Sequence, residues 1–129
     1  MSLINVPVSF GELIDKITIL EIKSERISDQ QKLVNIRHEL DLLEHTWNSS
    51  AASNADLSAS RAELKSVNEA LWEIEDRIRV KESEKAFDAE FIELARSVYV
   101  INDRRSVIKK DINLALGSEL VEEKSYKSY

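Results

Sequence analysis

The stretch FDAEFIELARSVYVINDRRSVIKKDI, residues 87–112, places apolar side chains at alternating steps of four and three residues. This heptad row consists of Phe87, Phe91, Leu94, Val98, Ile101, Ile108 and Ile112, and Arg105 occupies the one position that breaks it. The middle of the chain repeats the pattern with Leu64, Val67, Leu71, Ile74 and Ile78. Rows of this kind form narrow apolar seams that pack against another helix, as in coiled coils. We therefore expect an all-α fold.

Composition predicts a single helical domain over residues 1–129. The chain has two Gly, one Pro and 33% charged residues, so it lacks the breakers that sheets and turns need. The absence of Cys excludes disulfides and cysteine-ligated metals. A net charge of −6 argues against a nucleic-acid partner, which requires a basic face. Without a signal-like start or an apolar run of roughly 20 residues, we expect no membrane insertion and a cytoplasmic location.

Capping residues divide the chain into segments. Ser9 and Glu12 have the spacing of a capping box, in which each side chain accepts a hydrogen bond from the other residue's backbone N–H. Asp88 is expected to begin a later helix and Gly117 to end it. We expect six segments in order, which are an extended arm at 1–8, a first helix at 9–46, a loop at 47–56, a second helix at 57–83, a third helix at 88–116 and a tail at 117–129.

The continuity of the first helix decides between two architectures. The apolar pattern changes phase at Ser28-Asp29, and both residues can cap a new helix. No Gly or Pro lies there, so we favour a continuous helix and an antiparallel three-helix bundle with a long first helix. A break near Ser28-Asp29 would instead produce a four-helix bundle.

The start of the first helix is the most apolar part of the chain. If the helix is continuous, the second helix folds back along its later part and leaves this start uncovered. An exposed apolar patch usually marks an interface, so we predict contact with a second copy in a two-fold homodimer. The predicted interface residues are Phe10, Leu13, Ile17, Ile19, Leu20 and Ile22. With a broken helix, the same patch would close an intramolecular bundle.

Arg105 lies on the apolar seam of the third helix, and a desolvated guanidinium needs a fixed acceptor. One hypothesis is an anion-binding site between the helices. Its candidate residues are Lys16, Asn102, Arg105 and Lys109. There are two alternatives. One is a structural ion pair with a carboxylate of the first helix, for which the candidates are Glu12, Asp15 and Glu21, and the other is an arginine that reaches the surface while its aliphatic stem is buried.

No pattern of residues has the specificity of a catalytic or metal-binding motif. His38 and His45 are seven residues apart on one helix, which is too far for a shared metal ion. Acidic residues in the second and third helices are typical of solvated faces and helix starts. The sequence has no glycine-rich phosphate loop, nucleophile motif or HExxH. We therefore expect no metal, no cofactor and no catalytic residue, and we favour a non-enzymatic protein.

Several strings resemble a family of small bacterial proteins classed only as a domain of unknown function. They are VSFGELIDKITILEIK at 8–23, LWEIED at 71–76, ARSVY at 95–99 with NDRR at 102–105, and EEKSY at 122–126. The resemblance implies a small helical cytosolic protein without an assigned activity. Members of that family sometimes occur beside genes for surface-polysaccharide glycosyltransferases, which implies a link to glycan assembly.

Three hypotheses of function follow. The leading one is a helical interaction or assembly protein that self-associates through the start of the first helix, with an unidentified protein as a further partner. The second is a small-anion or nucleotide-processing all-α enzyme that uses the candidate anion site. The third, which rests on the resemblance alone, is an accessory factor in surface-polysaccharide biosynthesis.

Overall fold

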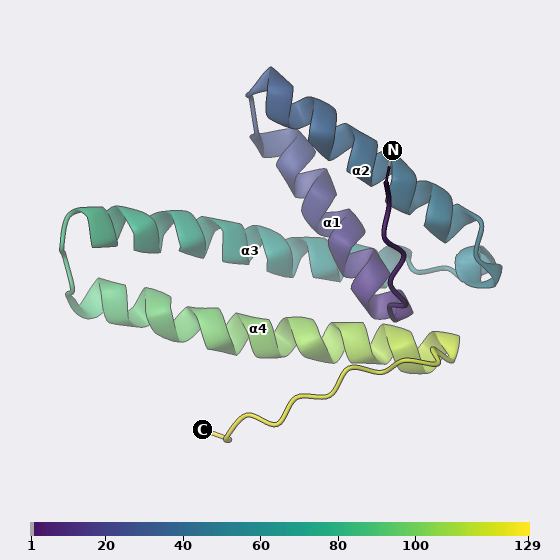
Figure 1. Ribbon diagram of the computed structural model, residues 1–129. Helices are drawn as coiled ribbons and strands as arrows, with labels where there is room; N and C mark the ends of the chain where they lie inside the picture. Colours follow the sequence, from purple (N-terminus) through teal and green to yellow (C-terminus); the bar gives the residue numbers. More distant parts are fainter. Residues whose placement is uncertain (1) are drawn as a thin grey trace.

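The computed structural model describes residues 2–129 and contains four α-helices over this range (Figure 1). They are α1 (Phe10–Arg26), α2 (Gln30–Asn48), α3 (Ser58–Ser83) and α4 (Ala89–Leu116), with a short 3₁₀ helix, η1 (Ala51–Asn54), between α2 and α3. The described residues contain no strand, which confirms the prediction of an all-α fold. The helices that carry the two heptad rows begin and end within one residue of the expected positions.

The favoured continuous first helix is wrong, because the chain breaks after Arg26 and starts a new helix at Gln30. Ile27 is extended, and the Asp29 side chain accepts hydrogen bonds from the backbone N–H groups of Gln31 and Lys32 at 2.9 and 3.1 Å. A capped start satisfies the exposed donors of the new helix, so the break needs neither Gly nor Pro. The antiparallel three-helix bundle is therefore replaced by a four-helix arrangement.

The four helices form two hairpins that cross (Figure 1). α3 and α4 are a long antiparallel pair, and α1 and α2 are a shorter pair joined at 27–29. α1 crosses the longer pair where α3 begins and α4 ends, so that Leu13 and Ile17 pack with Leu64, Ile108 and others in one core cluster. The opposite half of the α3–α4 hairpin extends beyond this crossing.

Most of the predicted homodimer interface lies in the core of its own chain. Leu13, Ile17, Leu20 and Ile22 are at most 7% exposed, whereas Phe10 and Ile19 are partly exposed. The break at 27–29 allows α2 to cover one side of α1, while α3 and α4 cover the other. The prediction that these four residues meet a second copy is therefore wrong, because the uncovered helix start on which it depended is absent.

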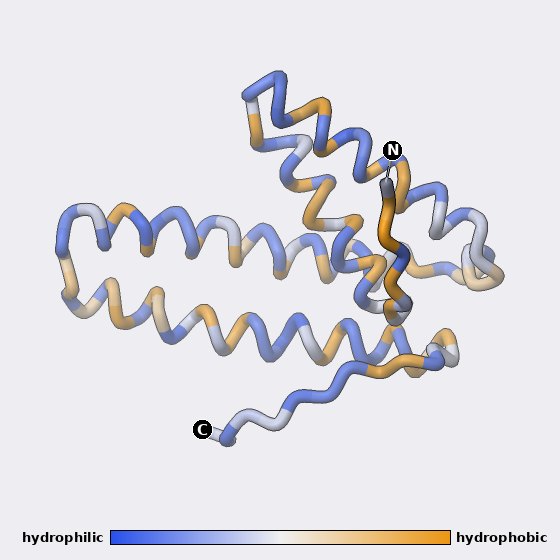
Figure 2. Tube along the Cα trace, in the orientation of Figure 1, coloured by the Kyte–Doolittle hydropathy of each residue, from blue (hydrophilic) through white to orange (hydrophobic). Residues whose placement is uncertain are grey.

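The extended arm before α1 is largely apolar, as Figure 2 shows by its orange colour. Leu3, Ile4 and Val6 of this arm are 70%, 90% and 68% exposed. No helix in the described part of the chain is long and apolar enough to cross a membrane.

Candidate functional site

A buried polar network lies where α1 crosses α3. Asp15 and Thr18 of α1 and Asn68 of α3 are each at most 5% exposed. The Asn68 amide donates to Asp15 Oδ1 at 2.8 Å and to Thr18 Oγ1 at 3.1 Å. Thr18 in turn donates its hydroxyl to the backbone oxygen of Asp15 at 2.8 Å. Because buried polar atoms are costly unless they are hydrogen-bonded, this network specifies how α1 sits on α3.

Arg105 of α4 joins the network from the other side. Its Nη1 donates to Asn68 Oδ1 at 3.2 Å, and the side chain is half-buried. Among residues 2–129, no carboxylate oxygen lies within 4.0 Å of its guanidinium nitrogens. The alternative of a structural ion pair at Arg105 is therefore wrong. A guanidinium has five N–H donors, so Arg105 retains donors for a further acceptor.

The carboxylates expected beside Arg105 pair with other cations. Lys109 Nζ lies 2.6 Å from Glu12 Oε2 and 3.7 Å from Asp15 Oδ2, and Arg61 lies 3.1 Å from Glu21. The Glu12 carboxylate thus contacts Lys109, while only the Ser9 half of the expected capping box forms, at 3.1 Å. Lys109 is one helical turn after Arg105 on the same face of α4, so the point along α4 at which α1 crosses decides which of the two cations meets α1.

The ion pair between Lys109 and Glu12 shifts the pKa of both groups. Burial by itself lowers the pKa of the Lys109 ammonium, but the hydrogen bond to Glu12 and the charge of Asp15 outweigh burial and raise this pKa above its ordinary value. Burial likewise favours a higher pKa for the Glu12 carboxyl, and the hydrogen bond and charge of Lys109 lower it instead. Both groups are therefore held in their charged forms.

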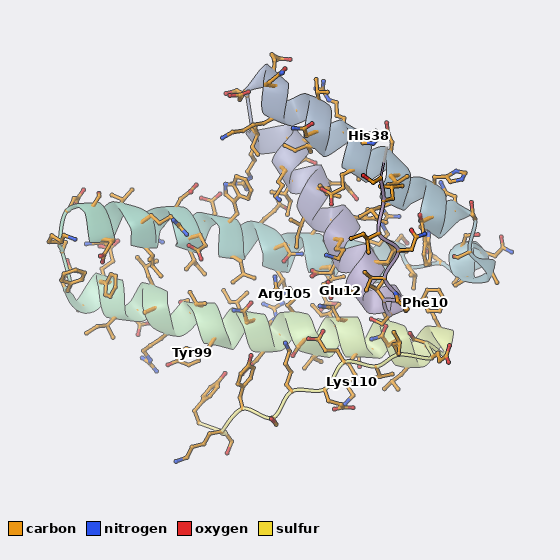
Figure 3. All side chains as sticks on the ribbon, viewed as in Figure 1. Phe10, Glu12, His38, Tyr99, Arg105 and Lys110 are labelled. Carbon is orange, nitrogen blue, oxygen red and sulfur yellow. The ribbon has the colours of Figure 1, made fainter. Side chains whose placement is uncertain are left out.

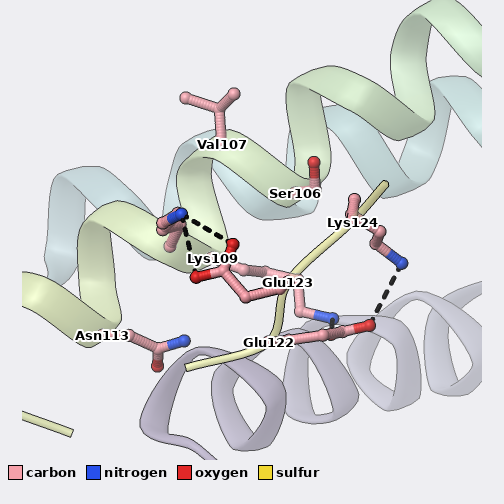
Figure 4. Close-up of a pocket in the computed structure, with 8 residues that line it drawn as sticks. Ser106, Val107, Lys109, Asn113, Glu122, Glu123 and Lys124 are labelled. Carbon is pink, nitrogen blue, oxygen red and sulfur yellow. Dashed lines mark hydrogen bonds and ion pairs between the residues drawn. The ribbon is translucent and has the colours of Figure 1, made fainter. Parts of the chain in front are cut away.

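The C-terminal tail runs back along α4 after Gly117 (Figure 1). Glu122 of the tail lies 3.5 Å from Lys109 Nζ and 3.1 Å from Lys124 Nζ (Figure 4). At the end of the tail, the Tyr129 hydroxyl donates to Asp103 Oδ2 at 2.8 Å. These contacts tie the tail to the helix at two separate points.

A cavity of about 570 Å³ lies between α4 and the tail. Its α4 wall consists of Tyr99, Asn102, Asp103, Arg105, Ser106 and Lys109, and its tail wall of Lys124, Tyr126, Lys127, Ser128 and Tyr129. Three of the four predicted anion-site residues, Asn102, Arg105 and Lys109, thus line one cavity. Figure 3 shows that Arg105 and Tyr99 both come from α4, whereas His38 belongs to α2.

Lys16 is not part of this cavity. Its side chain is 50% exposed and lies 3.6 Å from Glu12, and it lines a separate groove beside the N-terminal arm. The sequence interpretation missed every residue that the tail contributes. Its available signal was the tandem repeat Lys-Ser-Tyr at 124–129, which combines cations with aromatic rings.

The cations of the cavity fall into two groups. Lys109 and Lys124 have carboxylate partners, as described above. For Lys127, as for Arg105, the described residues provide no carboxylate oxygen within 4.0 Å. The cavity therefore contains two cations whose charge is not compensated by an ion pair.

The described residues contain no group of three or more His, Cys, Asp or Glu side chains that could hold a metal ion. His38 and His45 are exposed on α2.

The model of a family of unknown function (DUF6165) matches residues 4–129 of the chain. No curated protein and no solved structure matches it.

Proposed function

The chain belongs to this family of unknown function, and we propose that it binds a small anionic ligand through Arg105 in the cavity between α4 and the tail. The observation that carries the proposal is the half-buried Arg105 side chain, whose guanidinium has one hydrogen bond to Asn68 and no carboxylate partner among the described residues. Removing a cation from water is costly unless an anion or fixed acceptors replace the water. An anionic ligand in the cavity supplies that acceptor.

The surroundings of Arg105 support a binding site. The cavity volume is within the range of small-molecule sites in proteins. Asn68 is itself fixed by the buried network with Asp15 and Thr18, so the acceptor of the Arg105 hydrogen bond is held in place before a ligand arrives. Binding is what these features support, and the reaction of an anion-processing enzyme is not part of the proposal.

Replacing Arg105 with Gln tests the proposal. A charge-assisted hydrogen bond contributes about 1.5–3 kcal/mol, so we expect the affinity for a bound anion to fall by about tenfold to a hundredfold. The probes are inorganic phosphate, pyrophosphate, nucleoside monophosphates and dicarboxylates, first screened by thermal shift and then measured by titration calorimetry.

Arg104→Gln is the matched control, because Arg104 neighbours Arg105 in sequence but is exposed and does not line the cavity. It removes the same charge and is expected to retain the affinity. Equal losses in the two variants would mean that only net charge matters, and binding of none of the probes would refute the proposal.

Self-association is a second function, and the uncovered half of the α3–α4 hairpin favours it. Arg26 of α1 contacts Trp72 and Glu73 of α3, and residues 77–98 lie beyond these contacts; among residues 77–98 only Leu94 is buried. Val80, Phe87 and Ile92 are each more than half exposed. An isolated helix pair buries little apolar surface, so further packing would stabilise this half.

The partner that matches this surface is a second copy of the chain. On α3, an acidic block at 73–76 is followed by a basic block at 77–81. Within one chain Arg79 already lies 3.1 Å from Glu75 and Arg77 lies 3.0 Å from Glu90. In a two-fold arrangement with the two α3 helices antiparallel, the acidic block of each copy would lie opposite the basic block of the other and add to these pairs. The proposed homodimer interface therefore lies on α3 rather than on α1.

Reversing one charge tests the homodimer. We expect the wild-type protein at tens of micromolar to have twice the 14.8 kDa mass of one chain by light scattering. Arg79→Glu should be a monomer, because it places a carboxylate opposite the acidic block of the other copy. The Arg79 side chain is 78% exposed, so folding is not at risk. Val34→Glu, at a 62% exposed site on α2, should remain a dimer. A monomeric wild-type protein would rule out this interface.

The accessory role in surface-polysaccharide biosynthesis rests only on the sequence resemblance. No contact or cavity in the described residues adds to it.

A further inference from the structure

We infer that the anion bound in this cavity is a phosphate monoester that carries a planar ring, which is the chemistry of a mononucleotide. The inference rests on the proposed function, because it takes Arg105 as the partner of the phosphate. It adds a role for the C-terminal tail, whose aromatic side chains form the other wall of the cavity.

The charge of the cavity limits the number of phosphates. Lys109 and Lys124 are already compensated by carboxylates, whereas Asp103 of the cavity wall keeps its negative charge, because the Tyr129 hydroxyl that it accepts is neutral. Arg105 and Lys127 are the two cations left over. These two cations and the Asp103 carboxylate leave one net positive charge, which a phosphate monoester, with about 1.5–2 negative charges at pH 7, is sufficient to neutralise. A chain of several phosphates has more negative charge than these two side chains neutralise.

The aromatic lining indicates what the phosphate is attached to. Tyr99 of α4 and Tyr126 and Tyr129 of the tail all line the cavity. The rings of Tyr99 and Tyr129 meet edge to face with centroids 5.2 Å apart, so they form one packed wall. Tyr126 is 79% exposed, and the one group found over its ring among the described residues is Lys124 Nζ, 5.9 Å from the centroid, so the opposite face of the ring is available to a ligand. Planar heterocycles stack on such rings with little dependence on hydrogen bonds.

The size and polarity of the cavity agree with this ligand. Its volume of about 570 Å³ exceeds what a free phosphate ion fills and is in the range of sites for small organic molecules. Asn102, Ser106 and Ser128 line the same space and provide hydrogen-bonding groups for the polar edge of a ring or a sugar.

Titration calorimetry with matched probes tests the inference on the full chain. Adenosine 5′-monophosphate and uridine 5′-monophosphate contain both phosphate and planar ring, ribose 5-phosphate lacks the planar ring, and adenosine lacks the phosphate. We expect at least one of the two nucleotides to bind about tenfold or more tightly than ribose 5-phosphate, and adenosine to bind weakest.

Two variants at one exposed position separate stacking from a structural effect. Tyr126→Leu should abolish the preference for the nucleotide and leave the affinity for ribose 5-phosphate unchanged. Tyr126→Phe keeps the ring and should keep the preference.

Each outcome of the titration bears on one of the two claims. If ribose 5-phosphate binds as tightly as both nucleotides, the ring is not recognised and this inference is overturned, while the anion site stands. If Tyr126→Leu retains the preference, the stacking role of the tail is overturned. If none of the phosphorylated probes binds, the phosphate assignment fails, and binding of a dicarboxylate would then keep the anion site alone.

Discussion

An Ile17→Glu variant is expected to be unfolded or to melt far below the wild-type protein. Ile17 is 0% exposed and lies in the core cluster that joins α1 to α3 and α4. A carboxylate there has no cation beside it, and burying it or keeping it protonated costs at least about 3 kcal/mol. The total stability of a domain of this size is about 5–15 kcal/mol, so the loss is a large part of it. Circular dichroism during heating and in urea measures the effect.

Val34→Glu is the control for the Ile17→Glu experiment, since it makes a similar change at a site on α2 that is 62% exposed. It should change the melting temperature little, because surface substitutions usually alter stability by less than about 0.5 kcal/mol. If Ile17→Glu remained folded with an unchanged melting temperature, Ile17 would not be in the core. The arrangement of α1 described above would then be incorrect.

Gly11→Ala is expected to destabilise the protein by about 3 kcal/mol, although Ala normally favours a helix. The first turn of α1 lies directly against the end of α4. A Cβ at Gly11 would clash with the backbone oxygen of Lys109 and lie 3.0 Å from Asn113 Oδ1. The clash pushes α1 away and breaks the buried hydrogen bond from the Gly11 N–H to Asn113 Oδ1, which is 2.7 Å long. The midpoint of urea unfolding measures the change.

The other glycine of the chain is the matched control. Gly117 ends α4 with φ of 64° and has no atom within 4 Å of an added Cβ. Gly117→Ala therefore has only the conformational penalty of the left-handed region, about 1–2 kcal/mol. A Gly11→Ala variant as stable as the wild-type protein would show that α1 and α4 are farther apart than described.

The ends of the two long helices can be predicted from the sequence because the signals that set them are local. Heptad spacing and the cap at Asp88 specify α3 and α4, and Asp88 accepts a hydrogen bond from the Phe91 N–H as expected. The break at 27–29 was misjudged because a continued helix and a newly capped one differ little in local energy. The break is stabilised by tertiary packing, because it brings Leu33 and Ile36 of α2 against Leu20 of α1. A pattern of neighbouring residues does not show this packing.

Part of the candidate site could likewise be predicted from the sequence, and part of it could not. Arg105 could be singled out because it is a cation in an apolar heptad row. Helical spacing connects it with Asn102 and Lys109, which line the same cavity. Lys16 lines a separate groove, because the direction of its side chain depends on how α1 packs against α4. Tyr126 and Lys127 were missed, because no periodicity indicates that a non-helical tail turns back along α4.

The amino-acid sequence alone is enough to predict the features that repeat along a single helix. The all-α class, the extents of α3 and α4 and the exceptional position of Arg105 all follow from side-chain spacing and backbone caps, which act within a few residues. Three-dimensional packing decided which faces meet. Packing buries the start of α1 inside its own chain and brings Glu12 into an ion pair with Lys109. It also places Arg105 in the wall of a cavity whose other wall is the tail. These outcomes depend on where and at what angle whole helices cross, and no short-range pattern specifies such a crossing.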